Sequence, residues 1–230
     1  MSETKYKYNK YNNPLAKIRS KYIAIKIFNN LQQNKLLDLI HYNKHYQKLM
    51  KIKLKDYKNE FSKIEIEIIP KENTYGKFIN FSKNIQIYFN DNKKEIEKRK
   101  ITKDDKVTKI KIIINHNIKS LSDLFSRCKC IKKINFIKFN RDDINDMSWM
   151  FCRCISLEEI NLSNFNTTNV TNMAGMFSYC SSLKELDLSN FNTSKIEYMN
   201  YMFKGCSSNL SLICSNELIK KKFLETKNFK

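Results

Sequence analysis

A 26-residue register runs through the second half of this chain and limits what the chain can fold into. Residues 147–165 read MSWMFCRCISLEEINLSNF and residues 173–191 read MAGMFSYCSSLKELDLSNF, and the two segments align without a gap. The same offset aligns two columns of identical residues, Phe125, Phe151, Phe177 and Phe203, and Cys128, Cys154, Cys180 and Cys206. Self-similarity at such a period is the signature of stacked units, each burying its apolar face against the next.

The spacing inside one unit assigns a role to each part. Leu157, Ile160 and Leu162 match the L-x-x-L-x-L strand of a leucine-rich repeat, and alternation directs Ile160 and Leu162 toward the core. The return stretch Val170–Cys180 has apolar residues three and four apart, which predicts a short helical turn laid against the strand. The register predicts one parallel sheet with a strand in each unit, near residues 132–136, 158–162, 184–188 and 210–214.

The full pattern, M-x-x-M-F-x-x-C-x-x-L-x-x-L-x-L-S-x-F-N-T, resembles the BspA-like leucine-rich repeats over residues 108–215. The resemblance implies a right-handed solenoid used for adhesion or protein binding, without catalysis. Bacterial members of that family are exported, which leaves an exported surface adhesin as one alternative function. The first residues here, MSETKYKYNKYNNP, have no apolar stretch typical of a signal peptide, so we expect a cytoplasmic protein.

The segments around the repeats predict the rest of an α+β fold. We expect a short solenoid of about four coils, capped on one side by a helical and an antiparallel β segment and on the other by a C-terminal helix. Asn216 is a suitable N-cap for that helix. The predicted segments are a disordered tail at 1–13, helices at 14–60, antiparallel β structure at 61–107, the repeats at 108–215 and the capping helix at 216–230.

The helical segment carries a second resemblance, to the F-box pattern. Its order I-F-x-x-L, then a leucine pair, matches Ile27, Phe28, Leu31 and Leu36 without gaps, although the usual Leu-Pro opening is missing. The resemblance implies that these four residues dock to the adaptor of a cullin ubiquitin ligase, with the repeats choosing the substrate. A helical bundle that spaces its leucines in this way for packing alone is the competing interpretation.

The formal charge of +20 raises the question of a nucleic-acid partner. Residues 1–60 hold fourteen basic and four acidic residues, whereas residues 121–215 hold ten and nine. The lysines are scattered rather than gathered in a stripe with aromatic residues, so we expect no nucleic-acid partner. There is also no apolar run long enough to span a membrane, and we expect a monomer that binds other proteins.

No catalytic, metal or cofactor site emerges from the residue types. A column of single cysteines cannot surround a tetrahedral ion, and the chain has no C-x-x-C pair. Three glycines are too few for a phosphate-binding loop, and no acid–base constellation accompanies the three histidines. We therefore expect a protein without enzymatic activity, cofactor or metal.

Function should then depend on the outward strand positions. These form a flat polar face that is either a protein-binding face or merely solvated. The candidate protein-binding face consists of Lys133, Asn135, Ile137, Glu159, Asn161, Ser163, Glu185, Asp187 and Ser189.

Overall fold

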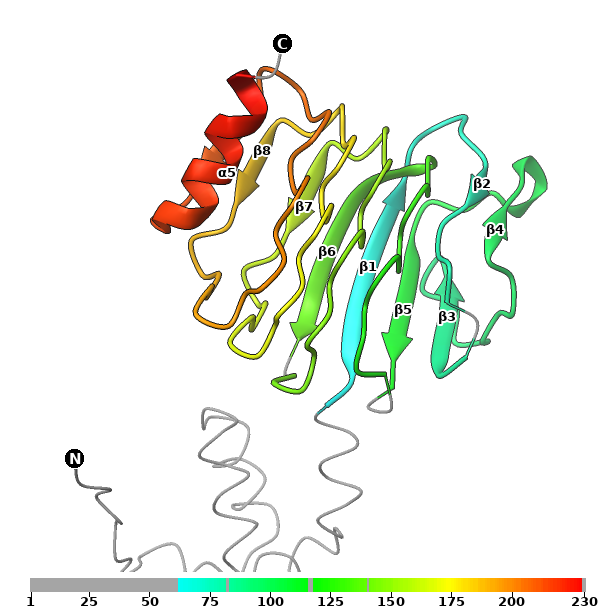
Figure 1. Cartoon of the computed structure of the whole chain (residues 1–230). Helices are drawn as coiled ribbons and strands as arrows, with labels where there is room; N and C mark the ends of the chain where they lie inside the picture. The colour runs from blue at the N-terminus through cyan, green and yellow to red at the C-terminus, as the bar shows by residue number, and fades with distance from the viewer. Residues whose placement is uncertain (1–61, 82, 116–117, 140, 229–230) are drawn as a thin grey trace, which may run out of the picture. The chain divides into compact units, whose positions relative to one another are not determined.

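The computed structural model describes residues 62–81, 83–115, 118–139 and 141–228, and this part is mostly β with one C-terminal helix. Its strands form mixed sheets that lie side by side in a row (Figure 1). The predicted tail at 1–13 and the predicted helices at 14–60 lie outside the described residues. No helix in the described ranges is long and apolar enough to cross a membrane.

The first part of the described chain is antiparallel, as predicted. Strand β5 lies between β1 and β3 and pairs with both, and β1 also pairs antiparallel with β6. Ile64, Ile66 and Ile68 alternate along β1 and are fully buried, because side chains of a strand point to opposite faces in turn. The elements are β1 (Ile64–Pro70), β2 (Gly76–Lys77), β3 (Ile85–Phe89), β4 (Lys100–Ile101), the short 3-10 helix η2 (Lys103–Asp105), β5 (Ile110–Ile114) and β6 (Ile131–Phe139).

The later strands each lie within a predicted segment and are only three residues long. They are β7 (Glu159–Asn161), β8 (Glu185–Asp187) and β9 (Ser211–Ile213). β6 pairs parallel with β7, and β8 pairs parallel with β9.

The prediction of one continuous parallel sheet is wrong, because no strand pairing joins β7 to β8. Ile160 of β7 and Leu186 of β8 nevertheless pack into the same core. Asn190 bridges the interruption, donating from Nδ2 to the carbonyl oxygens of Leu162 (3.1 Å) and Ser163 (3.2 Å). The units stay together without pairing between β7 and β8, because other backbone hydrogen bonds join successive units.

Those bonds lie in four turn segments, residues 121–128, 147–154, 173–180 and 199–206. Alternate N–H groups donate to the next unit, as from Met147 to the Asn172 oxygen (2.9 Å) and from Phe151 to the Met176 oxygen (2.9 Å). N–H groups between them close turns within their own segment, as from Cys154 to the Phe151 oxygen (3.1 Å). Four such bonds cross each of the three junctions.

The helical turn predicted for Val170–Cys180 is therefore wrong. An α-helix would direct every N–H back along its own segment, whereas here alternate groups leave it. Each turn segment also contains two residues with positive φ, such as Trp149 (φ 55°) and Arg153 (φ 59°), which a right-handed helix excludes. Met173, Met176 and Phe177 are buried as the spacing indicated, so the pattern predicted burial correctly and conformation incorrectly.

A large buried aromatic cluster fills the space between the turn segments and the strands. Phe151 stacks between Phe125 (ring centroids 5.8 Å, interplanar angle 11°) and Phe177 (5.5 Å, 10°). Phe139 and Phe165 begin a second column, with centroids 4.3 Å apart. Every ring thus contacts its equivalent in the neighbouring unit, and burial of this area is the main stabilising term.

The C-terminal helix α5 (Glu217–Asn228) is confirmed. The side-chain oxygen of Asn216 accepts hydrogen bonds from the N–H groups of Leu218 (3.0 Å) and Ile219 (3.2 Å), which is the geometry of an N-cap. Ile219 is fully buried, and the ring of Phe223 meets Phe203 edge-on at 5.3 Å. The helix therefore covers the aromatic column of the last unit.

Candidate protein-binding face

Most of the predicted face projects from neighbouring strands, as the alternation required. Lys133 and Asn135 lie on β6, and Glu159 and Asn161 lie on β7. The equivalent pair, residues 185 and 187, lies on β8. Residues 133, 159, 161, 185 and 187 are exposed, while Asn135 is half-buried. Ser163 and Ser189 are also exposed but follow the strands, in turns. These positions of the face thus share one side of the strands.

Ile137 continues the alternation of Lys133 and Asn135, and it also lies at an irregularity of the sheet. The pairing of β1 with β6 shifts register between Glu65 and Ile66, whose partners are Lys138 and Phe136. Ile137 is the extra residue in that bulge, and 47% of its surface is exposed. The bulge therefore leaves Ile137 on the side that alternation predicted and interrupts the alternation only after it, where Lys138 is half-buried and Phe139 is buried.

Polar contacts on the face run between equivalent positions of successive units. Lys133 Nζ lies 2.7 Å from Glu159 Oε2, and Asn161 Nδ2 donates to Asn135 Oδ1 at 2.9 Å. The hydrogen bond and charge of Lys133 lower the pKa of Glu159. Hydrogen bonds from Ser189 likewise lower the pKa of Asp187. Both carboxylates are therefore charged at neutral pH, and the face offers fixed acceptors and donors to a partner.

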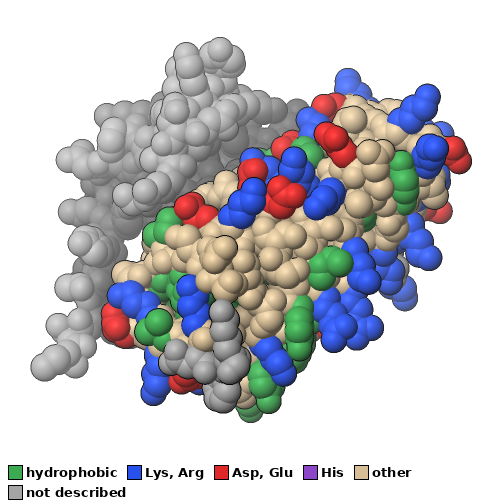
Figure 2. All heavy atoms as spheres, turned by 90° about the horizontal axis from the view of Figure 1, so that it is seen from above, with side chains coloured by type: hydrophobic (Ala, Val, Ile, Leu, Met, Phe, Trp, Pro, Cys, Tyr) green, Lys and Arg blue, Asp and Glu red, His purple; other side chains and the backbone are tan. Residues whose placement is uncertain are grey.

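The structure extends the face beyond the residues that the repeat identified. Ser211 and Ile213 on β9 are exposed, and Glu65 and Lys111 on β1 and β5 form an ion pair of 3.2 Å. The alternating isoleucines of β1 contained this signal, but the antiparallel segment was expected only to cap the repeats. Figure 2 shows acidic side chains interspersed among basic ones along one side of the described part.

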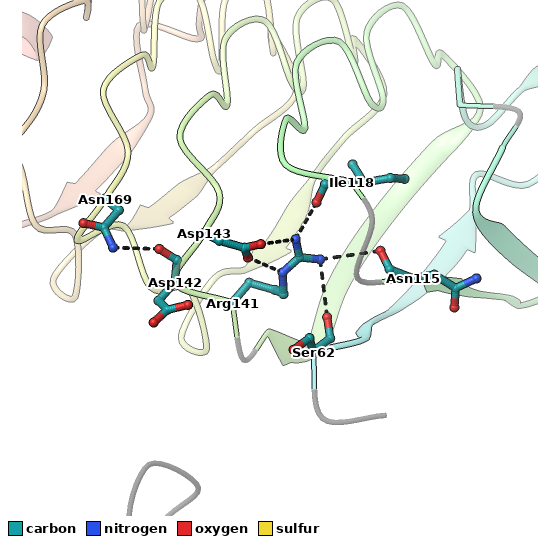
Figure 3. Close-up of polar contacts among 7 residues, drawn as sticks. All are labelled: Ser62, Asn115, Ile118, Arg141, Asp142, Asp143 and Asn169. Carbon is teal, nitrogen blue, oxygen red and sulfur yellow. Dashed lines mark hydrogen bonds and ion pairs between the residues drawn. The ribbon is translucent and has the colours of Figure 1, made fainter. Parts of the chain in front are cut away.

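A buried arginine holds the antiparallel strands and the units together, and sequence reasoning missed it (Figure 3). Only 2% of the Arg141 surface is exposed. Its guanidinium donates to both oxygens of Asp143, at 2.5 Å and 3.0 Å, and to the Ile118 oxygen at 2.5 Å. It also donates to the Ser62 and Asn115 oxygens, at 3.4 Å and 3.5 Å.

The position of Arg141 in the register explains its role. One unit later the equivalent residue is Thr167, whose hydroxyl donates to the Asn192 oxygen (3.1 Å) and accepts from the Asn192 N–H (2.7 Å). A threonine reaches the next unit, whereas an arginine reaches Ser62, which immediately precedes the paired strands. The departure from the repeat pattern at 141–143 was the available signal, and it marks the junction between the two kinds of structure.

The cysteine column is structural. The Cys154, Cys180 and Cys206 thiols donate to the oxygens of Phe125, Phe151 and Phe177 in the preceding unit, at 3.0, 3.1 and 3.1 Å. Burial raises the pKa of Cys206 to about 12 and that of Cys130 to about 11. Within the described ranges no group of His, Cys, Asp and Glu could hold a metal ion.

The adaptor-docking residues Ile27, Phe28, Leu31 and Leu36 lie outside the described residues, as do the three histidines.

Comparison with known protein families gives a match. Residues 119–221 match the model of a family described as Mycoplasma protein of unknown function, DUF285. This range covers the 26-residue units and the beginning of α5, and the description assigns no activity. No curated protein and no solved structure gives a match.

Proposed function

We propose that residues 119–215 form a right-handed leucine-rich-repeat solenoid, and that the chain is a non-catalytic scaffold whose strand face binds a partner protein. One observation carries the proposal: positions 26 residues apart, Asn135, Asn161, Asp187 and Ile213, line up on one accessible side of β6 to β9. Stacked repeats create extended surfaces of this kind, and such surfaces typically serve protein binding.

The chemistry of the face supports protein binding over catalysis. Its acids and bases sit in exposed pairs such as Lys133–Glu159, and no pair is enclosed in a cavity where desolvation would prepare it for proton transfer. Exposed pairs of this type contribute little stability themselves but fix register and orientation when a partner covers them.

The test is quantitative capture of partners on the purified full chain. We expect the double variant Asn161→Arg/Asp187→Arg to lose specific proteins that the natural chain captures, because it places two cations in the middle of the face. The variant Asn200→Arg/Asp104→Arg makes the same charge change at exposed positions off the face and serves as control. Identical captured sets from all three proteins would contradict the proposal.

A further inference from the structure

A second surface, formed by the turn segments, has a composition quite unlike the strand face. It surrounds a cavity of about 560 Å³, and the lining includes Lys77, Asn80, Arg127, Trp149, Arg153 and Tyr179. Arg127, Arg153 and Tyr179 are equivalent positions of three successive units, and Lys77 comes from β2. The cavity therefore combines both parts of the described chain.

Two glycines fix the aromatic rings of this cavity. A Cβ added to Gly175 would lie 2.2 Å from Cε3 of Trp149, and one added to Gly205 would lie 2.4 Å from Cδ1 of Tyr179. Each ring thus occupies space that any other residue of the next unit would fill. Rings held by neighbouring backbone lose little conformational entropy on binding, which favours their use as anchors.

The cations around these rings have no acidic partner in the part of the chain that the structure describes. Among the described residues, no ion pair involves Lys77, Arg127 or Arg153, and the only acid in the lining is Asp123. The guanidinium carbon of Arg153 lies 5.1 Å from the centroid of the Tyr179 ring, a cation–π contact that leaves its N–H groups able to donate. On the strand face, by contrast, Lys133 and Lys111 are already paired with acids.

We propose that this cavity binds an acidic, partly apolar peptide segment of a partner protein. Carboxylates of the segment would pair with Lys77, Arg127 and Arg153, and an apolar side chain would pack on Trp149. Tryptophan, tyrosine and arginine are the residues that dominate protein-binding hot spots, and three unpaired cations select an anionic partner. This inference rests on the proposed function and adds to it a second contact of defined chemistry.

The arrangement favours a peptide over single-stranded nucleic acid. A nucleic-acid platform stacks successive bases on free aromatic faces. Along the stack of units, Tyr179 lies between Arg153 of the preceding unit and Gly205 of the following one, so both of its faces are occupied. Among the residues that line the cavity, Trp149 is the only other aromatic ring, so consecutive bases have no second free ring there.

Trp149 gives a local signal for the test, since it is the only tryptophan of the chain. The full chain is titrated with a short peptide of alternating Glu and Leu, which has no fluorescence of its own. The counter-probes are a Lys–Leu peptide and an oligouridylate of similar length. We expect the Glu–Leu peptide alone to shift the emission of Trp149 in a saturable way.

Variants then assign the binding to the cavity. Arg127→Glu/Arg153→Glu should weaken the Kd for the Glu–Leu peptide about tenfold or more, because two attractive contacts become repulsive. The control Lys184→Glu/Lys221→Glu changes the charge equally at exposed positions outside the cavity and should leave the Kd unchanged. If the charge reversal prevents folding, Arg127→Gln/Arg153→Gln provides the same comparison without repulsion.

Three outcomes would overturn the inference: no saturable change in Trp149 emission, equal weakening in the cavity and control variants, or tighter binding of the oligouridylate. The strand-face variant Asn161→Arg/Asp187→Arg should titrate like the natural chain. Failure of the strand-face proposal would appear as unchanged partner capture in that variant, independently of this titration.

Discussion

The antiparallel part and the 26-residue units hold their strands side by side through different hydrogen bonds. In the antiparallel part, strands of five to seven residues such as β1 and β5 are rich in isoleucine and hold each other by long ladders. In the units after β6, three-residue strands contribute little, and the turn segments carry four backbone bonds per junction. The residue types of each part match its structure. The β-branched residues of the antiparallel part favour extended strands, while Met, Phe and Cys of the units fill the space behind the turns.

This difference shows that hydrogen bonds between strands need not be what holds a row of adjacent strands together. In the units the strands present side chains, while the turn segments and the phenylalanine columns supply the cohesion. Five predictions follow from this division, from the largest expected effect to the smallest.

Phe151→Ala should be the most damaging, with a loss of about 3–5 kcal/mol in the free energy of unfolding. The ring stacks on Phe125 and Phe177, so its removal leaves a cavity facing two neighbours. Chemical denaturation followed by circular dichroism measures the loss. Ile137→Ala, at an exposed bulge, should cost much less. Similar losses for the two variants would refute the cohesive role of the column.

Arg141→Met should cost about 2–4 kcal/mol, because it removes the donor for three carbonyl oxygens and the partner of Asp143. We expect a specific consequence: relative to the natural chain, hydrogen exchange should accelerate more at the amides of β1 and β5 than at the amides of the turn segments. Exchange followed by mass spectrometry measures this. Uniform acceleration across both parts would show that Arg141 does not join them.

A pair of glycines compares the two parts directly. Gly175→Ala should cost about 1–3 kcal/mol, since φ is +61° and the new methyl group meets Trp149. Gly76→Ala, in the antiparallel part, has φ +129° but nothing within 4 Å, so it should cost less. Thermal unfolding of both variants provides the ranking. The reverse order would mean that Trp149 moves away without cost.

The Arg141–Asp143 pair also predicts a pH dependence. Burial acts to raise the pKa of Asp143, but the Arg141 guanidinium outweighs it and holds the pKa below the ordinary value of 3.8. The pair's contribution is complete above that ordinary value and is lost as pH falls through the lower folded-state pKa. Asp143→Asn should flatten the decline of stability in acid. An unchanged acid profile in this variant would assign the decline to other groups.

The smallest effect concerns reactivity rather than stability. Burial raises the pKa of the Cys128, Cys154 and Cys180 thiols, so the thiolate that reacts with disulfide reagents is scarce in the folded state. We expect slow thiol modification of the native chain at pH 8 and rapid modification after denaturation. Rapid reaction of all seven cysteines without unfolding would contradict the burial of the column.

The sequence predicted burial and register well, and local conformation less well. Phe177 and Leu186 occupy core positions as expected, because apolar spacing reports directly on burial. The conformation of the turn segments could not be predicted from the sequence, because a helix and a run of tight turns both bury apolar residues that are three and four positions apart. The contact between the Trp149 ring and Gly175 could not be predicted from the sequence, because it depends on a positive φ. Arg141 only departs from the repeat pattern in the sequence, and the structure was needed to reveal its partners.

The turn segments also give the stack an electrical direction. Each of the four turn-segment bonds that cross a junction runs from an N–H of one unit to an oxygen of the next, so these peptide dipoles are parallel. Their positive pole points toward the C-terminal end, whereas an α-helix has its positive pole at its N-terminus. At the negative pole, Asn80 donates its N–H to the Leu124 oxygen (2.9 Å) and its amide to the Ser126 oxygen (2.8 Å). The stack therefore has two chemically distinct ends, and a further unit inserted between them would find donors and acceptors already facing the correct way.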